Sequence, residues 1–280
     1  MLNCCEELYY ANFYASLLLE AVATALLVFI GGGTFIRVDI PLLNNGKNDH
    51  VIETAAVFGL TLAGLLYCLR NVSGAYVNPA VTCAAILTRK TSILRGFFYV
   101  IFQCAGGILG ALMLRELIPH SIEKDLSNTI LSDDVTLGKG IALEAIFTFT
   151  YSWIYFSSKS SNVFKGFGGP LAVGLFYGAS HIVIMQYTGC SLNPARSFGP
   201  AILTNRLDHH WVYWAGPVLS ACLAGLVNDI VFKCAKLVEY PRLRSCSLII
   251  CKPSREEAML VEYSRHHNFD PSTTNSEYCA

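Results

Sequence analysis

The chain carries the tripeptide Asn-Pro-Ala twice, at residues 78–80 and again at residues 193–195. Asn is a strong helix N-cap and Pro is preorganised for the first helical turn, so each copy predicts the start of a helix. The apolar segments that follow, 78–88 and 193–203, are too short to cross a bilayer, which takes about 20 residues. They are predicted to be re-entrant half-helices, which membranes tolerate only where protein or a watery cavity covers the exposed backbone.

The composition is that of a membrane protein. Of 280 residues, 53% are hydrophobic and only 14% are charged, whereas a soluble domain carries about 25% charged residues. The net charge of zero gives no reason to expect a nucleic-acid partner. The eleven cysteines lack metal-ligand spacing, so neither a metal nor another cofactor is predicted. No nucleophile–base set stands at a recognisable spacing, and an enzyme is not predicted.

Six apolar runs are long enough to span a bilayer. They cover residues 13–36, 51–70, 92–114, 138–157, 168–187 and 210–232. The predicted fold is therefore an all-α membrane protein with six transmembrane helices and two re-entrant half-helices. The domain boundaries that follow are a cytosolic N-terminus at 1–12, a channel domain at 13–232 and a cytosolic tail at 233–280.

The channel domain repeats itself. Glu20 stands four residues before Thr24, as Glu144 stands four before Thr148, and an Asn-Pro-Ala segment follows the second and the fifth span. Repeat one covers about 13–114 and repeat two about 138–232. Three spans per half invert the second half relative to the first. The two half-helices are then expected to enter from opposite faces and to meet N-terminus to N-terminus near the bilayer centre.

Positive charges indicate the orientation, because cytoplasmic loops carry an excess of Lys and Arg. With both termini inside, the inner loops and the polar tail after about residue 240 hold more basic residues than the outer loops. The inner loops contain Arg70, Arg89, Lys90, Arg95, Lys159 and Lys165. The chain is predicted to be an integral protein of the plasma membrane with cytosolic termini.

Two polar residues, Asn78 and Asn193, are candidates for a pore centre, and a third, Arg196, is a candidate for the pore lining. Half-helix N-termini present free N–H groups and partial positive charge, which repels cations. Asn78 and Asn193 can donate from their amides to a passing oxygen, although most Asn residues at such positions only cap helices. Arg196 follows the second tripeptide directly. In a membrane it must face protein or water, so it is interpreted as a pore-lining charge rather than a snorkelling one.

The paired Asn-Pro-Ala boxes and the stretch from Tyr187 to Gly199 are similar to those of the aquaporin (major intrinsic protein) family, which the chain resembles over residues 10–235. The resemblance implies six tilted helices around one narrow pore per subunit, and a homotetramer. It also implies a four-position selectivity filter on the outer side. Those positions fall on Phe58, His181, Cys190 and Arg196.

The filter residues resemble those of the water-selective subgroup. An aromatic ring and an imidazole opposite Arg196 leave a narrow polar opening that suits one water molecule, whereas glycerol-conducting relatives carry a small residue in place of His181. Those relatives usually carry Asp where this chain has Ser197. Three further positions agree with the water-channel subgroup, namely Ala201, Tyr213 and Trp214.

The resemblance also assigns roles outside the filter. Glu20 and Glu144 are implied to be structural carboxylates that accept hydrogen bonds from the loop before each half-helix, with a proton relay as the alternative. Cys190 is implied to be a mercurial-sensitive thiol facing the pore. Ser92 follows Arg89-Lys90-Thr91 and resembles a kinase site, although a basic turn explains the same residues.

The predicted function is a passive transmembrane water channel that excludes ions and protons and also passes hydrogen peroxide. The alternative is a low-conductance structural or junctional membrane protein of the same fold. A coupled transporter would need ion-coordinating carboxylates beside the half-helices, and neither box segment contains one. Gly106-x-x-x-Gly110 and Gly174-x-x-x-Gly178 permit close helix contact and are predicted to mark helix crossings within one subunit.

Overall fold

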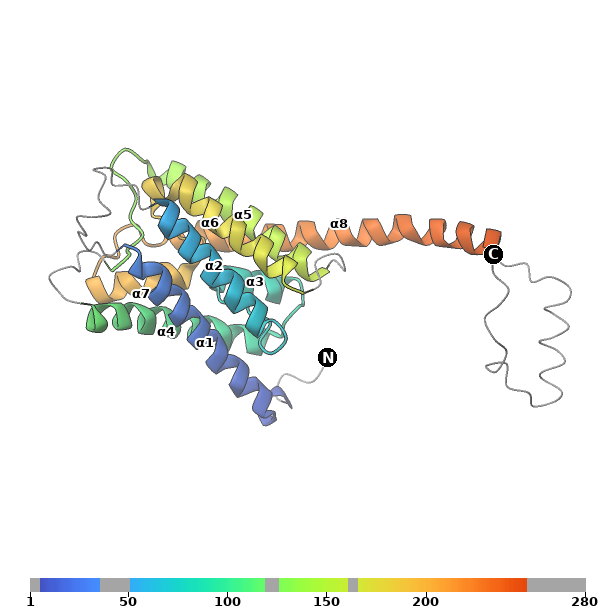
Figure 1. Ribbon diagram of the computed structural model, residues 1–280, viewed down its shortest axis with the longest axis horizontal. Coiled ribbons are helices and arrows are strands. Elements are labelled where there is room, and N and C mark those ends of the chain that lie inside the picture. The colour runs from blue at the N-terminus through green and yellow to red at the C-terminus, as the bar shows by residue number, and fades with distance from the viewer. Residues whose placement is uncertain (1–5, 36–50, 119–125, 161–165, 251–280) are drawn as a thin grey trace, which may run out of the picture. The chain divides into compact units, whose positions relative to one another are not determined.

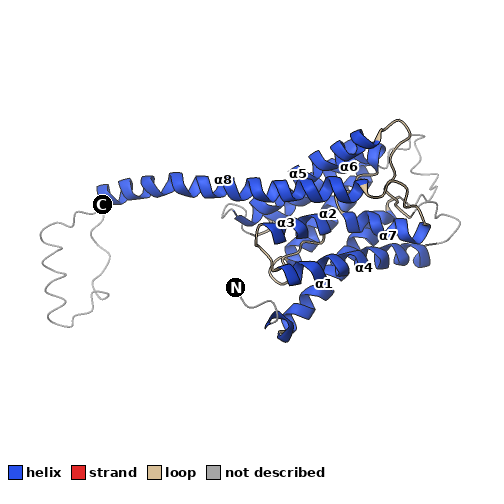
Figure 2. Ribbon diagram, turned by 180° about the vertical axis from the view of Figure 1, so that it is seen from behind, coloured by secondary structure: helices blue, strands red, loops and turns tan. Residues whose placement is uncertain are grey.

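A computed structural model describes residues 6–35, 51–118, 126–160 and 166–250, with only the backbone for 235–250. Its elements are a short 3-10 helix, η1 (Glu6–Tyr9), and the helices α1 (Ala11–Gly33), α2 (Val51–Leu69), α3 (Pro79–Leu87), α4 (Ile93–Leu117), α5 (Leu137–Ser160), α6 (Gly168–Thr188), α7 (Pro194–Thr204) and α8 (Val212–Ile250) (Figure 1). Over the described part of the chain, helix is the regular secondary structure throughout, as Figure 2 shows. Residues 1–230 form one compact unit and Val231–Ala280 a second.

The predicted fold class is confirmed: among the described residues, one short helix follows the second of six long helices and another follows the fifth, as expected. Among the described residues, α1, α2, α4, α6 and the Val212–Cys234 part of α8 are long and apolar enough to cross a membrane. The remaining long helix, α5, is less hydrophobic than these spans because it carries Glu144 and many Thr, Ser and Tyr residues.

One helix end and one short helix differ from the prediction. Helix α8 runs to Ile250, so the described backbone continues past residue 232 and past the predicted start of the polar tail near 240. Its residues beyond 232 include Ala, Lys, Leu and Glu, which favour helix, with Pro241 as the strongest opposing residue. The predicted tail beyond residue 250 lies outside the described residues. The helix η1 was not predicted, since four residues carry too little periodicity to be read.

The long helices pack in pairs through small residues. Helix α1 packs mainly on α4, and α2 mainly on α6. A Cβ added at Gly106 would overlap the carbonyl oxygen of Ala21, and one added at Gly174 would overlap that of Gly59. Both predicted Gly-x-x-x-Gly segments therefore lie at helix crossings within one subunit, as expected.

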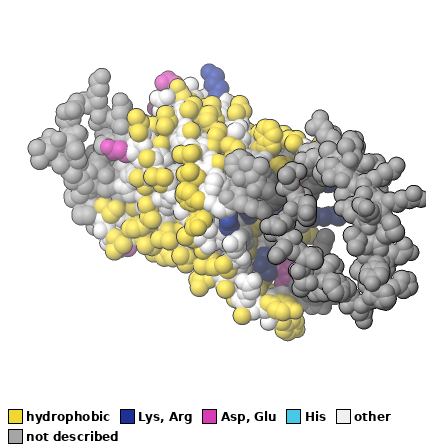
Figure 3. Space-filling view, turned by 45° about the vertical axis from the view of Figure 1, so that its right-hand side comes forward, with side chains coloured by type: hydrophobic (Ala, Val, Ile, Leu, Met, Phe, Trp, Pro, Cys, Tyr) yellow, Lys and Arg dark blue, Asp and Glu magenta, His cyan; other side chains and the backbone are white. Residues whose placement is uncertain are grey.

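The outer surface of the bundle is apolar, and its interior contains charged and polar side chains. Hydrophobic side chains cover most of the helical face seen in Figure 3, and the exposed ones include Leu18, Leu60, Ile146 and Leu219. In contrast, Glu20, Glu144, Gln103 and Arg196 are fully buried. Charges inside a lipid-exposed bundle are costly and mark functional or architectural sites, so these residues define where the site lies.

Candidate functional site

The two half-helices meet at their N-termini through a reciprocal pair of amides. Asn78 caps α3 by accepting from the Ala80 N–H at 2.8 Å, and Asn193 caps α7 by accepting from the Ala195 N–H at 3.0 Å. Nδ2 of Asn78 donates to the Leu192 carbonyl, and Nδ2 of Asn193 donates to the Val77 carbonyl, each at 2.8 Å. An Asn amide carries two N–H donors, so each side chain keeps a second donor beyond this cross-link.

The loops before the half-helices have a strained and repeated backbone. Ala75 and Cys190 each stand three residues before the box Asn and have φ of 50° and 53°, while Val77 and Leu192 have φ of 53° and 52°. Non-glycine residues in this region cost of order 1–3 kcal/mol each and persist only where the surroundings hold them. The same conformation in both halves points to a required direction of the backbone groups.

The two buried carboxylates hold these loops. Glu20 accepts from the N–H groups of Tyr76 at 3.0 Å and Val77 at 2.6 Å. Glu144 accepts from those of Ser191 and Leu192, both at 2.9 Å. In a trans peptide the C=O points opposite to the N–H. The carbonyls of the preceding residues therefore point away from the carboxylates, toward the middle of the bundle.

The first carboxylate has a further partner that the sequence did not single out. Gln103 of α4 donates to Glu20 Oε2 at 2.8 Å and to the Thr82 hydroxyl at 2.9 Å. The Ser73 hydroxyl also donates to Glu20, at 2.6 Å. A polar residue at one position of an apolar run was the available signal for Gln103. Glu20 therefore anchors α1, α3, α4 and the loop between α2 and α3 at one point.

Three of the four predicted filter residues are in contact. The rings of Phe58 on α2 and His181 on α6 stack with centroids 4.5 Å apart and an interplanar angle of 19°. The guanidinium carbon of Arg196 on α7 lies 5.0 Å from the Phe58 ring centroid. All three side chains are fully buried. The structure thus brings together, on three separate elements, residues that are up to 138 positions apart (196 − 58).

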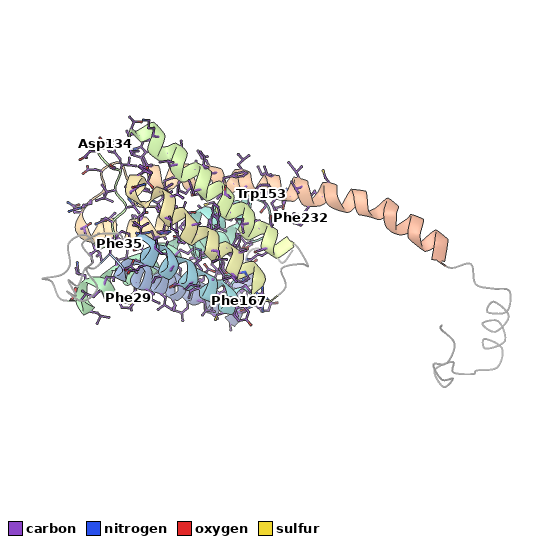
Figure 4. The ribbon with its side chains drawn as sticks, turned by 45° about the horizontal axis from the view of Figure 1, so that its top comes forward. Phe29, Phe35, Asp134, Trp153, Phe167 and Phe232 are labelled. Carbon is purple, nitrogen blue, oxygen red and sulfur yellow. The ribbon has the colours of Figure 1, made fainter. Side chains whose placement is uncertain are left out.

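Arg196 is held by groups that the sequence did not indicate. Its Nη1 donates to the Ser127 carbonyl at 2.6 Å and its Nη2 to the Ser127 hydroxyl at 2.8 Å. The Phe35 ring lies 5.7 Å from its guanidinium carbon. In Figure 4, Phe35 lies at the same end of the bundle as Asp134 and at the opposite end from Phe167. That end, which carries Arg196, is called the Arg196 mouth below.

Two buried polar atoms of this cluster lack a hydrogen-bond partner in the described protein: Nε2 of His181 and Nε of Arg196. Nδ1 of His181 lies 2.9 Å from the Tyr177 carbonyl. Since a carbonyl only accepts, Nδ1 carries the proton, and Nε2 of the neutral ring is an acceptor. Arg196 Nε–H is a donor. Buried unpaired polar groups call for an explanation, and an acceptor and a donor that flank one aromatic ring match a small hydroxylic molecule.

Cys190 lies in the loop leading into α7 and is fully buried. Its thiol belongs to the same buried apolar cluster as Phe58. Among the residues whose side chains the structure describes, five other free cysteines are less buried, namely Cys68, Cys83, Cys104, Cys222 and Cys234. Within the described residues, no group of three or more His, Cys, Asp or Glu side chains is placed to hold a metal ion.

Ser92 has a structural role at the opposite end of the bundle. Its hydroxyl caps α4 by accepting from the Arg95 N–H at 3.1 Å, and it donates to Glu7 Oε2 at 3.0 Å. Glu7, in η1, also pairs with Arg95 Nε at 3.1 Å. Phosphorylation of Ser92 stays a prediction, and it would place a second negative group beside Glu7.

Membrane-length helices that surround two half-helices joined head to head define a helical membrane channel protein. The family description "Major intrinsic protein" matches residues 7–228. The chain is 35% identical to mouse (Mus musculus) aquaporin-4 over 257 residues, 90% of this chain and 78% of that protein. It is 38% identical to sheep (Ovis aries) aquaporin-2 over 232 residues, 82% and 83% of the two chains. The chain belongs to the major intrinsic protein (aquaporin) family.

A solved structure shares the fold. The X-ray structure of the aquaglyceroporin from Plasmodium falciparum superposes with a TM-score of 0.69, covering 78% of this chain and 96% of that one. The two sequences are 19% identical over this match. The superposition therefore establishes the arrangement of helices, while the choice of solute depends on the residues of the filter.

Proposed function

We propose that this protein is a passive water channel whose selectivity filter consists of Phe58, His181, Cys190 and Arg196. The observation that carries the proposal is the unpartnered pair His181 Nε2 and Arg196 Nε beside the Phe58 ring. Water can accept from the arginine and donate to the imidazole at once. The aromatic ring restricts the width of the opening. Glycerol is wider than water, and the stacked Phe58 and His181 rings are expected to exclude it.

Ion and proton exclusion follows from the charges of the same path. The N-termini of α3 and α7 lie at Asn78 and Asn193, and each helix N-terminus carries roughly half a positive charge. Arg196 adds a full one. Glu20 and Glu144 accept hydrogen bonds from the adjacent loops through both oxygens, which supports a structural role over a proton relay. Hydrogen peroxide, only slightly larger than water, is proposed as a second permeant.

The experiment is stopped-flow light scattering of proteoliposomes under osmotic steps of sucrose and of glycerol. Fast shrinkage in both solutes, without re-swelling in glycerol, is the expected result. Re-swelling in glycerol would contradict the proposed selectivity. Shrinkage no faster than that of empty liposomes, with correct folding verified by gel filtration and circular dichroism, would instead favour a low-conductance structural or junctional protein.

The assembly, the membrane and the orientation are proposed with the function. We infer a homotetramer in the plasma membrane, with residues 13–232 as the channel domain and both termini in the cytosol. An apolar groove on the outer face of α2 and α6, lined by Ile52, Leu60 and Leu175 among others, can be covered either by lipid or by a neighbouring subunit. Mass determination in detergent by light scattering tests the tetramer: a monomeric mass would contradict it.

A further inference from the structure

The end of the bundle opposite Arg196 carries a lysine whose amino group is turned inward. Lys159, at the end of α5, is exposed as a whole. Its Nζ nevertheless donates to the Gly74 carbonyl and to the Tyr155 hydroxyl. It also lies 4.6 Å from the ring centroid of Tyr76 and 4.5 Å from that of Tyr155. No carboxylate pairs with it among the described residues. The ammonium group therefore contacts backbone and two aromatic rings although the residue as a whole is exposed, whereas a lysine head group usually stays in water.

The contacts of Lys159 fall on the backbone that leads into α3. Tyr155 stands one helical turn before Lys159, so both side chains leave the same face of α5. The Tyr155 hydroxyl donates to the Gly74 carbonyl at 2.9 Å and to the Ala75 carbonyl at 3.3 Å. The Ala75 carbonyl points away from Glu20, because the Tyr76 N–H of the same peptide points toward it. Tyr155 and Lys159 therefore occupy the side of the loop that faces the middle of the bundle.

The other half of the molecule lacks this arrangement. Gly189 and Cys190 stand four and three residues before Asn193, as Gly74 and Ala75 stand before Asn78. Among the described residues, no side chain or backbone N–H donates to the carbonyls of Gly189 and Cys190. Equivalent carbonyls are thus engaged by side chains in one half and available in the other. Because the two halves are internal repeats, these carbonyls belong to opposite ends of the proposed water path. The two ends therefore differ in whether side chains bind the loop carbonyls.

We propose that Lys159 and Tyr155 form a constriction at the mouth opposite Arg196, where they take the carbonyls that permeating water would otherwise use. The inference rests on the proposed function as a water channel. Water crossing this mouth must displace the ammonium group and the phenol from Gly74 and Ala75. The Tyr76 and Tyr155 rings narrow the space around them. The predicted orientation places this constriction at the cytosolic mouth, far from the Phe58–His181–Arg196 filter.

The test measures osmotic water permeability per channel in proteoliposomes for four variants. Lys159→Met keeps the length of the stem and removes the charge and the donors, and a rise of roughly tenfold is expected when a charge-assisted hydrogen bond is lost. Tyr155→Phe, which leaves Lys159 on Gly74, is expected to give a smaller rise. Lys159→Arg keeps charge and donors and should stay near the wild-type rate. Lys139→Met is the matched control, since Lys139 is an exposed residue near the start of the same helix.

The outcomes separate this inference from the proposed function. If the wild type conducts water and neither Lys159→Met nor Tyr155→Phe conducts faster, the constriction is overturned and the channel stands. If the wild type matches empty liposomes while Lys159→Met conducts, the constriction is supported, and the proposed function of the wild type as a water channel is contradicted. If wild type and both variants match empty liposomes and are folded, both proposals fail. Should Lys159→Met not assemble, Tyr155→Phe decides the same question.

Discussion

The His181 imidazole lies flat on the Phe58 ring, with centroids 4.5 Å apart. Tyr177, one turn earlier on α6, fixes the imidazole from its other nitrogen through its carbonyl, 2.9 Å from Nδ1. The position and the tautomer of His181 are thus set by two groups. Nε2 is left as a buried acceptor without a partner in the described protein, next to the Phe58 ring that Arg196 also contacts.

His181→Ala is expected to admit glycerol. The substitution removes the ring that stacks on Phe58 and leaves a wider, less polar opening. Glycerol permeability should rise by roughly tenfold, which corresponds to about 1.4 kcal/mol of barrier, while water permeability should not fall. A glycerol step in stopped flow measures both rates, because the initial shrinkage reports water permeability and the later re-swelling reports glycerol permeability. Ile182→Ala is the control, because Ile182 follows His181 on α6 and its side chain is exposed; equal glycerol entry in both variants would contradict the assignment.

Glu20→Gln is expected to destabilise the fold. The carboxylate accepts from Tyr76 N–H on one oxygen and from Val77 N–H on the other. Whichever way a glutamine amide is placed, its NH₂ faces one of these two donors. A buried donor left unpaired costs about 1–3 kcal/mol, so the thermal midpoint in detergent should fall by roughly 2–10 °C.

The matched control for Glu20 is Glu116→Gln. The Glu116 side chain is 59% exposed and pairs with the adjacent Arg115, and exposed ion pairs contribute about 0–1 kcal/mol. Differential scanning fluorimetry of the two variants should separate them clearly. Equal midpoints for Glu20→Gln and the wild type would show that this carboxylate does not hold the loop.

The sequence predicted the fold because its signals were local and repeated. The boxes at Asn78 and Asn193 each contain a cap and a proline, so helix starts followed from neighbouring residues alone. The length of the apolar runs predicted the long helices. The end of α8 was missed because the polar composition after residue 232 does not prevent a helix; only Pro241 opposes it strongly.

The groups that support the site were harder to predict. Ser127 holds Arg196 through its carbonyl and hydroxyl, yet it lies 69 residues away in an irregular loop. Nothing in the local pattern distinguishes that serine from its neighbours. From the sequence, Lys159 is indistinguishable from other basic residues at helix ends. Its inward contact with Gly74 depends on how α5 packs beside the loop before α3, which is a tertiary property.

Mercurial inhibition tests the placement of Cys190. Mercuric chloride should reduce water permeability, because the Cys190 thiol lies in the same buried cluster as the filter residue Phe58. The Cys190→Ala variant lacks this thiol and should be insensitive. Burial should make the reaction slow, over minutes. Cys68 is exposed on α2, so Cys68→Ala should remain as sensitive as the wild type. Unchanged inhibition in Cys190→Ala would assign the effect to a different cysteine.

Gly199→Ala is expected to prevent the docking of α7 on α4. A Cβ at Gly199 would overlap the carbonyl oxygen of Gly107, a backbone atom that cannot move without displacing α4. Overpacking of this kind costs about 1–3 kcal/mol or more, and it would shift Arg196, which lies in the first turn of the same half-helix. Gly138→Ala is the matched control, since a Cβ there has no heavy atom within 4 Å and alanine favours helix by roughly 1 kcal/mol. The two variants should differ in thermal midpoint and in water permeability. Gly199→Ala should have a lower midpoint and a lower water permeability than the wild type, whereas Gly138→Ala should keep or raise the midpoint. A Gly199→Ala protein with the wild-type midpoint would show that the contact between α4 and α7 is looser than the structure has it.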